Sequence, residues 1–179
     1  MIELFTTLSN HMLKGLMLHA QWADMFQFLN MKGFSRQQER RFEDESRAMR
    51  RMHDFAITHC NKLINDTGLK VDEIPANWFE HTRFEVDNNT RKNYTKQIFK
   101  KWHDWETETK QMYETTLKTL ADNGKIADWN MVNELLRDVD YELQQLTQQI
   151  LDYESMDWDM EYLLYVQPQF FGGEMPLAY

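Results

Sequence analysis

Glu45 is the residue of this sequence that points most directly to chemistry, because it occupies the apolar face of a predicted helix. The residues that share this face recur at steps of three and four, and they are Phe42, Met49, Met52, Ala56, His59 and Leu63. An unpaired carboxylate on a buried face costs several kcal/mol. Glu45 must therefore meet a cation, share a proton with another group, or bind a metal ion.

Three further ionisable residues occupy the core side of other predicted helices. His19 belongs to the apolar stripe of the first, Glu106 lies on the third, and Glu142 lies at the shoulder of the fourth. Carboxylate oxygens and imidazole nitrogens are donors that suit Fe or Mn. Together with Glu45 these residues predict a site for a single metal ion, provided that four helices bring them to one level.

The apolar pattern predicts two long helices in the first third of the chain, over residues 5–29 and 35–65. Ser35 and Gln38 form a capping-box pattern at the start of the second helix. Gly68 follows its end, where glycine commonly terminates a helix. The link between the two helices is short, so they are expected to run antiparallel.

A second pair of helices is predicted over residues 90–124 and 128–153, with Asp128 as the cap of the last one. The links are therefore short, long and short. A middle link of about 20 residues spans roughly 60 Å when extended, enough to run the length of the bundle. The sequence thus predicts an all-α four-helix bundle with one long crossover between the second and third helices.

This topology allows heights along the bundle to be compared. At about 1.5 Å per residue, His19 and Glu45 lie roughly 20 Å from the first link. Glu106 lies about 24 Å along the third helix, and Glu142, counted back from the second short link, falls near the same level. The four ionisable side chains are therefore expected to converge in one layer at the middle of the bundle.

The composition fits one helical domain. Of the 179 residues 42% are hydrophobic and 13% aromatic, whereas Gly and Pro are few, which favours long helices around one core. Cys60 is the single cysteine, which excludes an intrachain disulfide and a thiolate cluster. The first residues do not resemble a signal peptide, and no apolar run approaches the roughly 20 residues of a membrane span. We expect a cytoplasmic protein that does not enter a membrane.

The charge distribution bears on partners. A net charge of -9 argues against nucleic-acid binding, which depends on neutralising phosphates. No Lys or Arg follows Arg137, whereas nine acidic residues do. The second predicted helix is rich in arginine instead, with Arg36, Arg40, Arg41, Arg47, Arg50 and Arg51. These regions are either two solvated faces, or the acidic part docks on a basic surface of its own or a neighbouring subunit.

Three short segments resemble the first link and second helix of the ferritin-like superfamily, the ferritins and rubrerythrins. They are MKGF at residues 31–34, FEDESRAM at 42–49 and HDF at 53–55. The resemblance implies a ferritin-like four-helix bundle over residues 8–155. In that family a di-iron site uses Glu from the first and third helices and Glu-x-x-His pairs from the second and fourth.

The resemblance also implies that this ligand set is degenerate. The family's second-helix Glu falls on Glu45, but its His partner falls on Ala48. The first-helix Glu falls on Met12, and the fourth-helix pair becomes Val139 and Glu142. The candidate metal ligands that remain are Glu45, Glu106, Glu142 and His19.

These candidate ligands have two interpretations. They could bind one Fe or Mn ion in metal handling or oxidation chemistry. Alternatively, the layer has lost its metal, and its members share protons or pair with nearby cations. The candidate cations are Lys14, Arg47 and Arg51. The chain would then be a noncatalytic helical bundle that acts as an interaction or assembly module. The residues leave both open, and no catalytic residue is assigned.

The C-terminal segment is aromatic and apolar. Residues 1–157 are predicted to form the bundle, and residues 158–179 a tail that packs on the bundle or covers a subunit interface. Because an exposed aromatic tail is costly in water, we expect a homo-oligomer in which Tyr165 and Phe170 are buried. A different protein partner is a further candidate.

Overall fold

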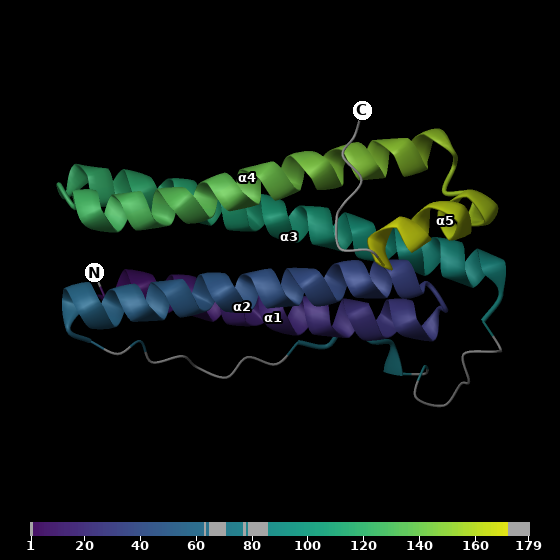
Figure 1. The fold of residues 1–179 in the computed structure, drawn as a ribbon, viewed down its shortest axis with the longest axis horizontal. Coiled ribbons are helices and arrows are strands. Elements are labelled where there is room, and N and C mark those ends of the chain that lie inside the picture. Colours follow the sequence, from purple (N-terminus) through teal and green to yellow (C-terminus); the bar gives the residue numbers. More distant parts are fainter. Residues whose placement is uncertain (1, 63, 65–70, 77, 79–85, 172–179) are drawn as a thin grey trace.

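The computed structural model describes residues 2–62, 64, 71–76, 78 and 86–171, which form an elongated bundle of helices (Figure 1). Its four long helices are α1 (Ile2–Phe28), α2 (Lys32–Cys60), α3 (Asn88–Asp122) and α4 (Ile126–Ser155). A short helix α5 (Met160–Val166) and a 3₁₀ helix η3 (Gln167–Phe171) follow. The helices α1 and α2 form one hairpin and α3 and α4 the other, joined by the long crossover after α2. The predicted all-α fold and its one-crossover topology are confirmed.

The two predicted N-terminal caps are wrong. The helix α2 begins at Lys32, and Met31 precedes it without a side-chain cap, so Ser35 lies within the helix and is buried. The helix α4 begins at Ile126. Asp128 lies in its first turn, where a carboxylate favours the helix dipole without being the cap.

The end of α2 and the start of α3 each coincide with a polar residue. The helix α2 ends at Cys60, earlier than predicted, because Asn61 adopts a left-handed conformation with φ of 50°. Gly68, the predicted terminator, lies outside the described residues. The carboxylate of Asp87 caps α3 by accepting a hydrogen bond from the Thr90 backbone N–H at 2.7 Å.

The core consists of two apolar clusters that follow each other along the bundle. One lies toward α5 and η3, and its largest members include Trp22, Phe99, Trp102 and Trp158. The other lies toward the opposite end around Tyr113. On α2 and α3, buried polar residues separate the two clusters, and they are Gln38, Arg41 and Glu45 on α2 and Glu106 and Thr109 on α3. The sequence-predicted layer therefore coincides with a break in the apolar core.

The buried face of α2 contains Glu45, Met52 and Ala56 as predicted, but it differs from the prediction near Phe42. Phe42 is 41% exposed, whereas Arg41 is only 6% exposed. The buried residues Gln38, Arg41 and Glu45 are three and four apart, so they share one face of the helix. Because neighbouring positions on a helix differ by about 100°, this difference exchanges an apolar residue for an arginine in the core.

The segment after α4 packs against the start of α2. The backbone N–H of Gly33 donates a hydrogen bond to Oε1 of Gln167 at 3.0 Å, and Phe170 packs on Phe34 with ring centroids 5.7 Å apart. A Cβ atom on Gly33 would collide with the backbone carbonyl of Gln167, so glycine is required for this close approach. The division of the chain at residue 157 stays a prediction, and residues 172–179 lie outside the described part.

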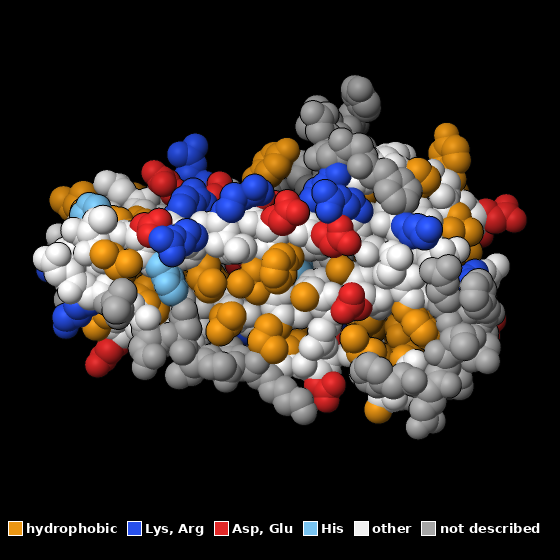
Figure 2. All heavy atoms as spheres, turned by 60° about the horizontal axis from the view of Figure 1, so that its bottom comes forward, with side chains coloured by type: hydrophobic (Ala, Val, Ile, Leu, Met, Phe, Trp, Pro, Cys, Tyr) orange, Lys and Arg blue, Asp and Glu red, His pale blue; other side chains and the backbone are white. Residues whose placement is uncertain are grey.

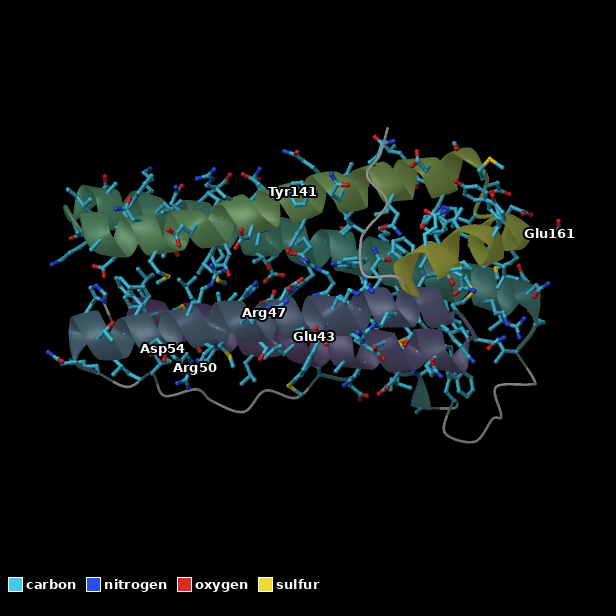
Figure 3. The ribbon with its side chains drawn as sticks, viewed as in Figure 1. Glu43, Arg47, Arg50, Asp54, Tyr141 and Glu161 are labelled. Atoms are coloured by element: carbon cyan, nitrogen blue, oxygen red, sulfur yellow. The ribbon has the colours of Figure 1, made fainter. Side chains whose placement is uncertain are left out.

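The exposed arginines of α2 are largely paired along their own helix. Arg36 pairs with Glu39 at 2.7 Å, Arg47 pairs with Asp44, and Arg50 pairs with Asp54 at 3.2 Å. Arg47, Arg50 and Asp54 are labelled along α2 in Figure 3. Basic and acidic side chains alternate on the surface shown in Figure 2. None of the helices in the described part of the chain is long and apolar enough to cross a membrane.

Candidate functional site

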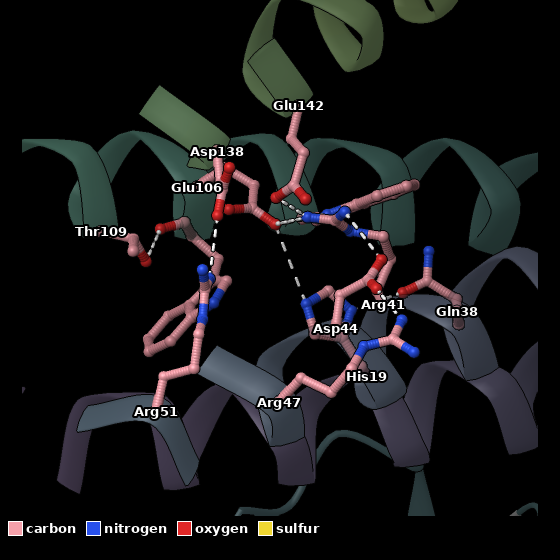
Figure 4. Close-up of polar contacts among 12 residues, drawn as sticks. His19, Gln38, Arg41, Asp44, Arg47, Arg51, Glu106, Thr109, Asp138 and Glu142 are labelled. Carbon is pink, nitrogen blue, oxygen red and sulfur yellow. Dashed lines mark hydrogen bonds and ion pairs between the residues drawn. The ribbon is translucent and has the colours of Figure 1, made fainter. Parts of the chain in front are cut away.

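Arg41 lies at the centre of the polar layer, which we define as His19, Gln38, Arg41, Glu45, Glu106 and Glu142 (Figure 4). Its Nη2 atom lies 3.5 Å from Oε1 of Glu106 on α3 and pairs closely with the carboxylate of Glu142 on α4. Nη1 lies 3.6 Å from Asp44 on the same helix. A single guanidinium from α2 thus joins the second hairpin through two of its carboxylates.

Glu106 is the most deeply buried carboxylate of the layer, with 1% of its surface exposed. Its Oε1 accepts a hydrogen bond from the indole N–H of Trp102, one turn earlier on α3, at 2.9 Å. Its other oxygen, Oε2, is buried and has no hydrogen-bond partner. Because a buried charge requires compensation, the contact with Arg41 is the main electrostatic support of this carboxylate.

His19 enters the layer from α1 as a neutral imidazole. Nδ1 of its ring lies 2.8 Å from Oε1 of Gln38. Because an amide oxygen only accepts, Nδ1 carries the hydrogen and donates this hydrogen bond. Burial and the charge of Arg41 lower the pKa of His19 to about 3. Nε2 lies 3.9 Å from Oε1 of Glu106 and has no hydrogen-bond partner. This contact is not an ion pair at neutral pH.

Glu45 faces the same layer from α2, one turn after Arg41. Burial, followed by the charge of Glu106, raises the pKa of Glu45 to about 8. Its side chain fits because Gly15 on α1 has no side chain: a Cβ atom there would lie 3.2 Å from Oε1 of Glu45 and 3.1 Å from the Trp105 ring. Because its pKa is raised to about 8, Glu45 is largely protonated at neutral pH.

The structure thus brings all four sequence-predicted residues to one level. Glu106 and Glu142 are joined through Arg41, His19 lies beside Glu106, and Glu45 interacts electrostatically with Glu106. The cations named from the sequence have other roles. Arg51 pairs with Asp138 on α4 at 2.9 Å, and the ammonium of Lys14 lies 5.1 Å above the Trp105 ring.

Sequence reasoning missed Arg41 as the cation of the layer. The sequence pattern places Arg41 with the other arginines on the basic surface of α2, because arginine is rarely buried unless it is paired. The signal that could have found it is the spacing Gln38, Arg41, Glu45, which places three polar residues on one helix face.

A second missed group lies next to the layer, toward Tyr113. His11 stacks on Trp105 with ring centroids 4.0 Å apart, and its Nε2 lies 2.7 Å from the hydroxyl of Thr109. That hydroxyl donates to the backbone carbonyl of Trp105, so it accepts from His11. Burial, with Lys14 nearby, lowers the pKa of His11 to about 4.

A cleft between α2 and α4 connects the layer with the surface. Its volume is about 740 Å³, and its lining includes the buried residues Arg41, Glu45 and Tyr113 together with exposed Arg47 and Tyr141. Solvent and small ions can therefore approach the layer from this side. Within the described residues, no group of three or more His, Cys, Asp or Glu side chains could hold a metal ion.

The architecture defines the class of protein: a helical bundle with the ferritin-like fold. No protein-family model matches the sequence, and a search of curated proteins gives no match. Solved structures do match. An open pore ferritin from the hyperthermophilic archaeon Archaeoglobus fulgidus superimposes with a TM-score of 0.77 and 15% identity, covering 94% of this chain and 93% of that one.

Two further structures of this archaeal ferritin give the same result. A closed form engineered by site-directed mutagenesis matches with a TM-score of 0.76, and a second structure of the open pore form with 0.75, each at 15% identity. Both alignments cover 94% of this chain and, respectively, 93% and 94% of the ferritin chain. These likenesses establish the fold over nearly the full length of both proteins.

Proposed function

We propose that this chain is a noncatalytic ferritin-like bundle in which the guanidinium of Arg41 supplies the positive charge of the mid-bundle layer, and that it works by associating with other protein chains. The observation that carries the proposal is the position of Arg41. Its guanidinium contacts Glu106 and Glu142, two of the carboxylates that the resemblance to ferritins assigns to metal binding.

A guanidinium differs from a metal ion in what it can do. It retains its charge at every physiological pH and satisfies carboxylates by hydrogen bonds, but it provides neither an open coordination position nor a redox couple. Glu45, which is largely protonated at neutral pH, and neutral His19 add no net charge beside it. The layer is therefore suited to joining the two hairpins rather than to oxidation chemistry.

Exposed apolar side chains support a role in association. Tyr165 on α5 is 79% exposed, and Leu151 and Met156 near the end of α4 are 53% and 47% exposed. Aromatic and large aliphatic side chains in contact with water favour burial between subunits. A homo-oligomer is the assembly we propose.

Metal content and metal-dependent stability test the role of Arg41. Wild-type protein purified without chelator should contain far less than one Fe or Mn per chain, and added Mn(II) should not raise its melting temperature. Arg41→Gln removes the charge but retains hydrogen-bonding groups, and this variant should gain Mn(II)-dependent stabilisation. The gain is about 2.7 kcal/mol when the ion is at 100 times its dissociation constant. Arg41→Lys, which retains a cation, is the control and should gain none.

A second candidate function is the binding of a single Fe or Mn ion, and one observation favours it. Nε2 of His19 and Oε2 of Glu106 are both buried without hydrogen-bond partners. An imidazole whose Nδ1–H is held by another side chain, here Gln38, is in the form that ligates metals. His19 and Glu106 would then be two of the ligands, and a third would have to move closer, because no three such side chains of the described residues are grouped to hold an ion.

Elemental analysis separates the two candidates. The metal-binding candidate expects about one ion per wild-type chain, and Glu106→Gln should remove it. Such a stoichiometry, or equal Mn(II) stabilisation of wild type and Arg41→Gln, would contradict the role that we propose for the guanidinium.

A further inference from the structure

The short helix α5 presents a face that nothing in the described part of the chain covers. Its inner residues Met160, Leu163 and Val166 are buried against the bundle. Glu161, Leu164 and Tyr165 are exposed. Because these residues are separated by three and four positions, they lie on one side of the helix. The outer face of α5 therefore offers an acidic group and two apolar side chains to solvent.

A groove of complementary character lies between α3 and α4 near α5. Its volume is about 340 Å³. Its apolar lining is formed by Ile150, Leu151 and the buried Trp158. The α3 side contributes Lys96 and Lys100. The remaining lining residues are His103, Asp104, Thr147 and Glu154.

Within the described part of the chain, the lysines of the groove lack close ion pairs. Among the described residues, neither Lys96 nor Lys100 forms an ion pair within 4.0 Å, in contrast to the paired arginines of α2. Trp158 is 2% exposed, and its indole N–H has no hydrogen-bond partner. The groove therefore combines an apolar surface with two lysines that lack close ion pairs to the described residues.

We propose that the outer face of α5 from a second copy of this chain docks in the α3/α4 groove. Tyr165 and Leu164 of one copy would cover Ile150 and Leu151 of the other, while Glu161 would approach the lysines of α3. The occupant is inferred from this complementarity of charge and apolar surface. Asp104 and Glu154 offset part of the positive charge of the groove, so the apolar contacts are expected to provide most of the binding energy.

The arrangement of the two surfaces favours a symmetric dimer. Both belong to the same end of the bundle, because Trp158 lines the groove and lies two residues before α5 (Figure 1). A two-fold axis at that end would let each copy supply one α5 face and one groove, so that every contact occurs twice. This inference rests on the associative part of the proposed function and names its surface.

Light scattering and sedimentation on the full-length chain test the surface. We expect wild type to dimerise and Tyr165→Ser to raise the dimer dissociation constant at least about ten-fold, as truncating a central aromatic contact does. Tyr141→Ser is the matched control, because Tyr141 is a half-exposed tyrosine on α4 outside this groove. The control should dimerise like wild type. Circular dichroism should show the same helix content for all variants.

Charge reversal tests the pairing itself. Lys96→Glu and Lys100→Glu, made separately, should weaken the dimer, and Glu161→Lys should do the same. Combining Glu161→Lys with at least one of the two lysine reversals should restore dimerisation, which a general structural defect would not do. Lys118→Glu, at an exposed position of α3 outside the groove, should have no effect.

The outcomes distinguish this surface from association as such. If wild type stays monomeric, both the dimer and the proposed homo-oligomer are overturned. If wild type associates but Tyr165→Ser and the reversals at the groove leave it unchanged, only the α5 surface is overturned. Dissociation by Tyr141→Ser, with Tyr165→Ser intact, would also overturn it.

Discussion

Replacing Glu45 with glutamine should make the protein more stable at neutral pH, and the gain should grow as the pH rises. Burial and Glu106 raise the pKa of Glu45 from 4.5 to about 8. Between these values the folded state holds a proton that the unfolded state releases. The free energy of unfolding therefore falls with rising pH because of this residue. Glutamine has nearly the same shape and carries no ionisable proton, so it removes this cost.

The size of the effect follows from the two pKa values. Integrating the proton linkage between about pH 6 and about pH 8 gives a loss of about 2 kcal/mol in the wild type that Glu45→Gln lacks. Glu45 is 8% exposed and lines the cleft between α2 and α4, so solvent screening places the effect at the lower side of this figure. His19 and His11, whose pKa values are lowered to about 3 and about 4, are neutral in the folded protein throughout that range.

Urea unfolding followed by circular dichroism at several pH values measures the difference directly. The free-energy gain of Glu45→Gln over wild type should widen toward high pH, whereas Glu43→Gln, at an exposed position of the same helix, should follow the wild type. A gain that does not change with pH would refute the reasoning, because it would mean that Glu45 does not hold an extra proton in the folded state.

Further predictions concern the packing of α2 and the ends of the helices. Gly33→Ala should displace η3 from α2 and lower the melting temperature, because its Cβ would meet backbone rather than a flexible side chain. Asp87→Ala should cost about 1 kcal/mol in urea unfolding through loss of the cap of α3. Arg41→Met should cost about 3–5 kcal/mol, because Glu106 is left buried without its cation. Adding Glu106→Leu and Glu142→Leu to that variant should recover this loss, since apolar replacement of a whole buried ion group is often neutral or stabilising by about 1–4 kcal/mol.

The fold was predictable because its determinants are repeated along the chain. Apolar residues at steps of three and four mark each long helix, and the lengths of the links select the topology. The level of the polar layer followed from counting residues from the first link, because helix rise is nearly constant. An error of a few residues at the end of α2 did not alter it.

The cation of the layer could not be read in the same way. Which residues of a helix face the core depends on its rotation, and on α2 the apolar Phe42 and the charged Arg41 compete for neighbouring positions. The apolar pattern favoured Phe42. The buried carboxylates of α3 and α4 favour Arg41, because leaving Glu106 without a cation costs more than exposing one aromatic ring. This preference arises between helices far apart in sequence, so a pattern within α2 does not contain it.

A guanidinium can fulfil one of the roles that a metal ion has in a buried layer of carboxylates. In either case a cation from the core joins carboxylates on different helices, and here Arg41 connects α2 to Glu106 on α3 and Glu142 on α4. In the function that we propose, the guanidinium would therefore fulfil the structural role of a metal ion without its coordination or redox chemistry. A buried ion group gives little net stability compared with apolar packing. Its value lies in holding the two hairpins in one register, since Glu106 and Glu142 can reach the guanidinium together only when α3 and α4 are aligned with α2.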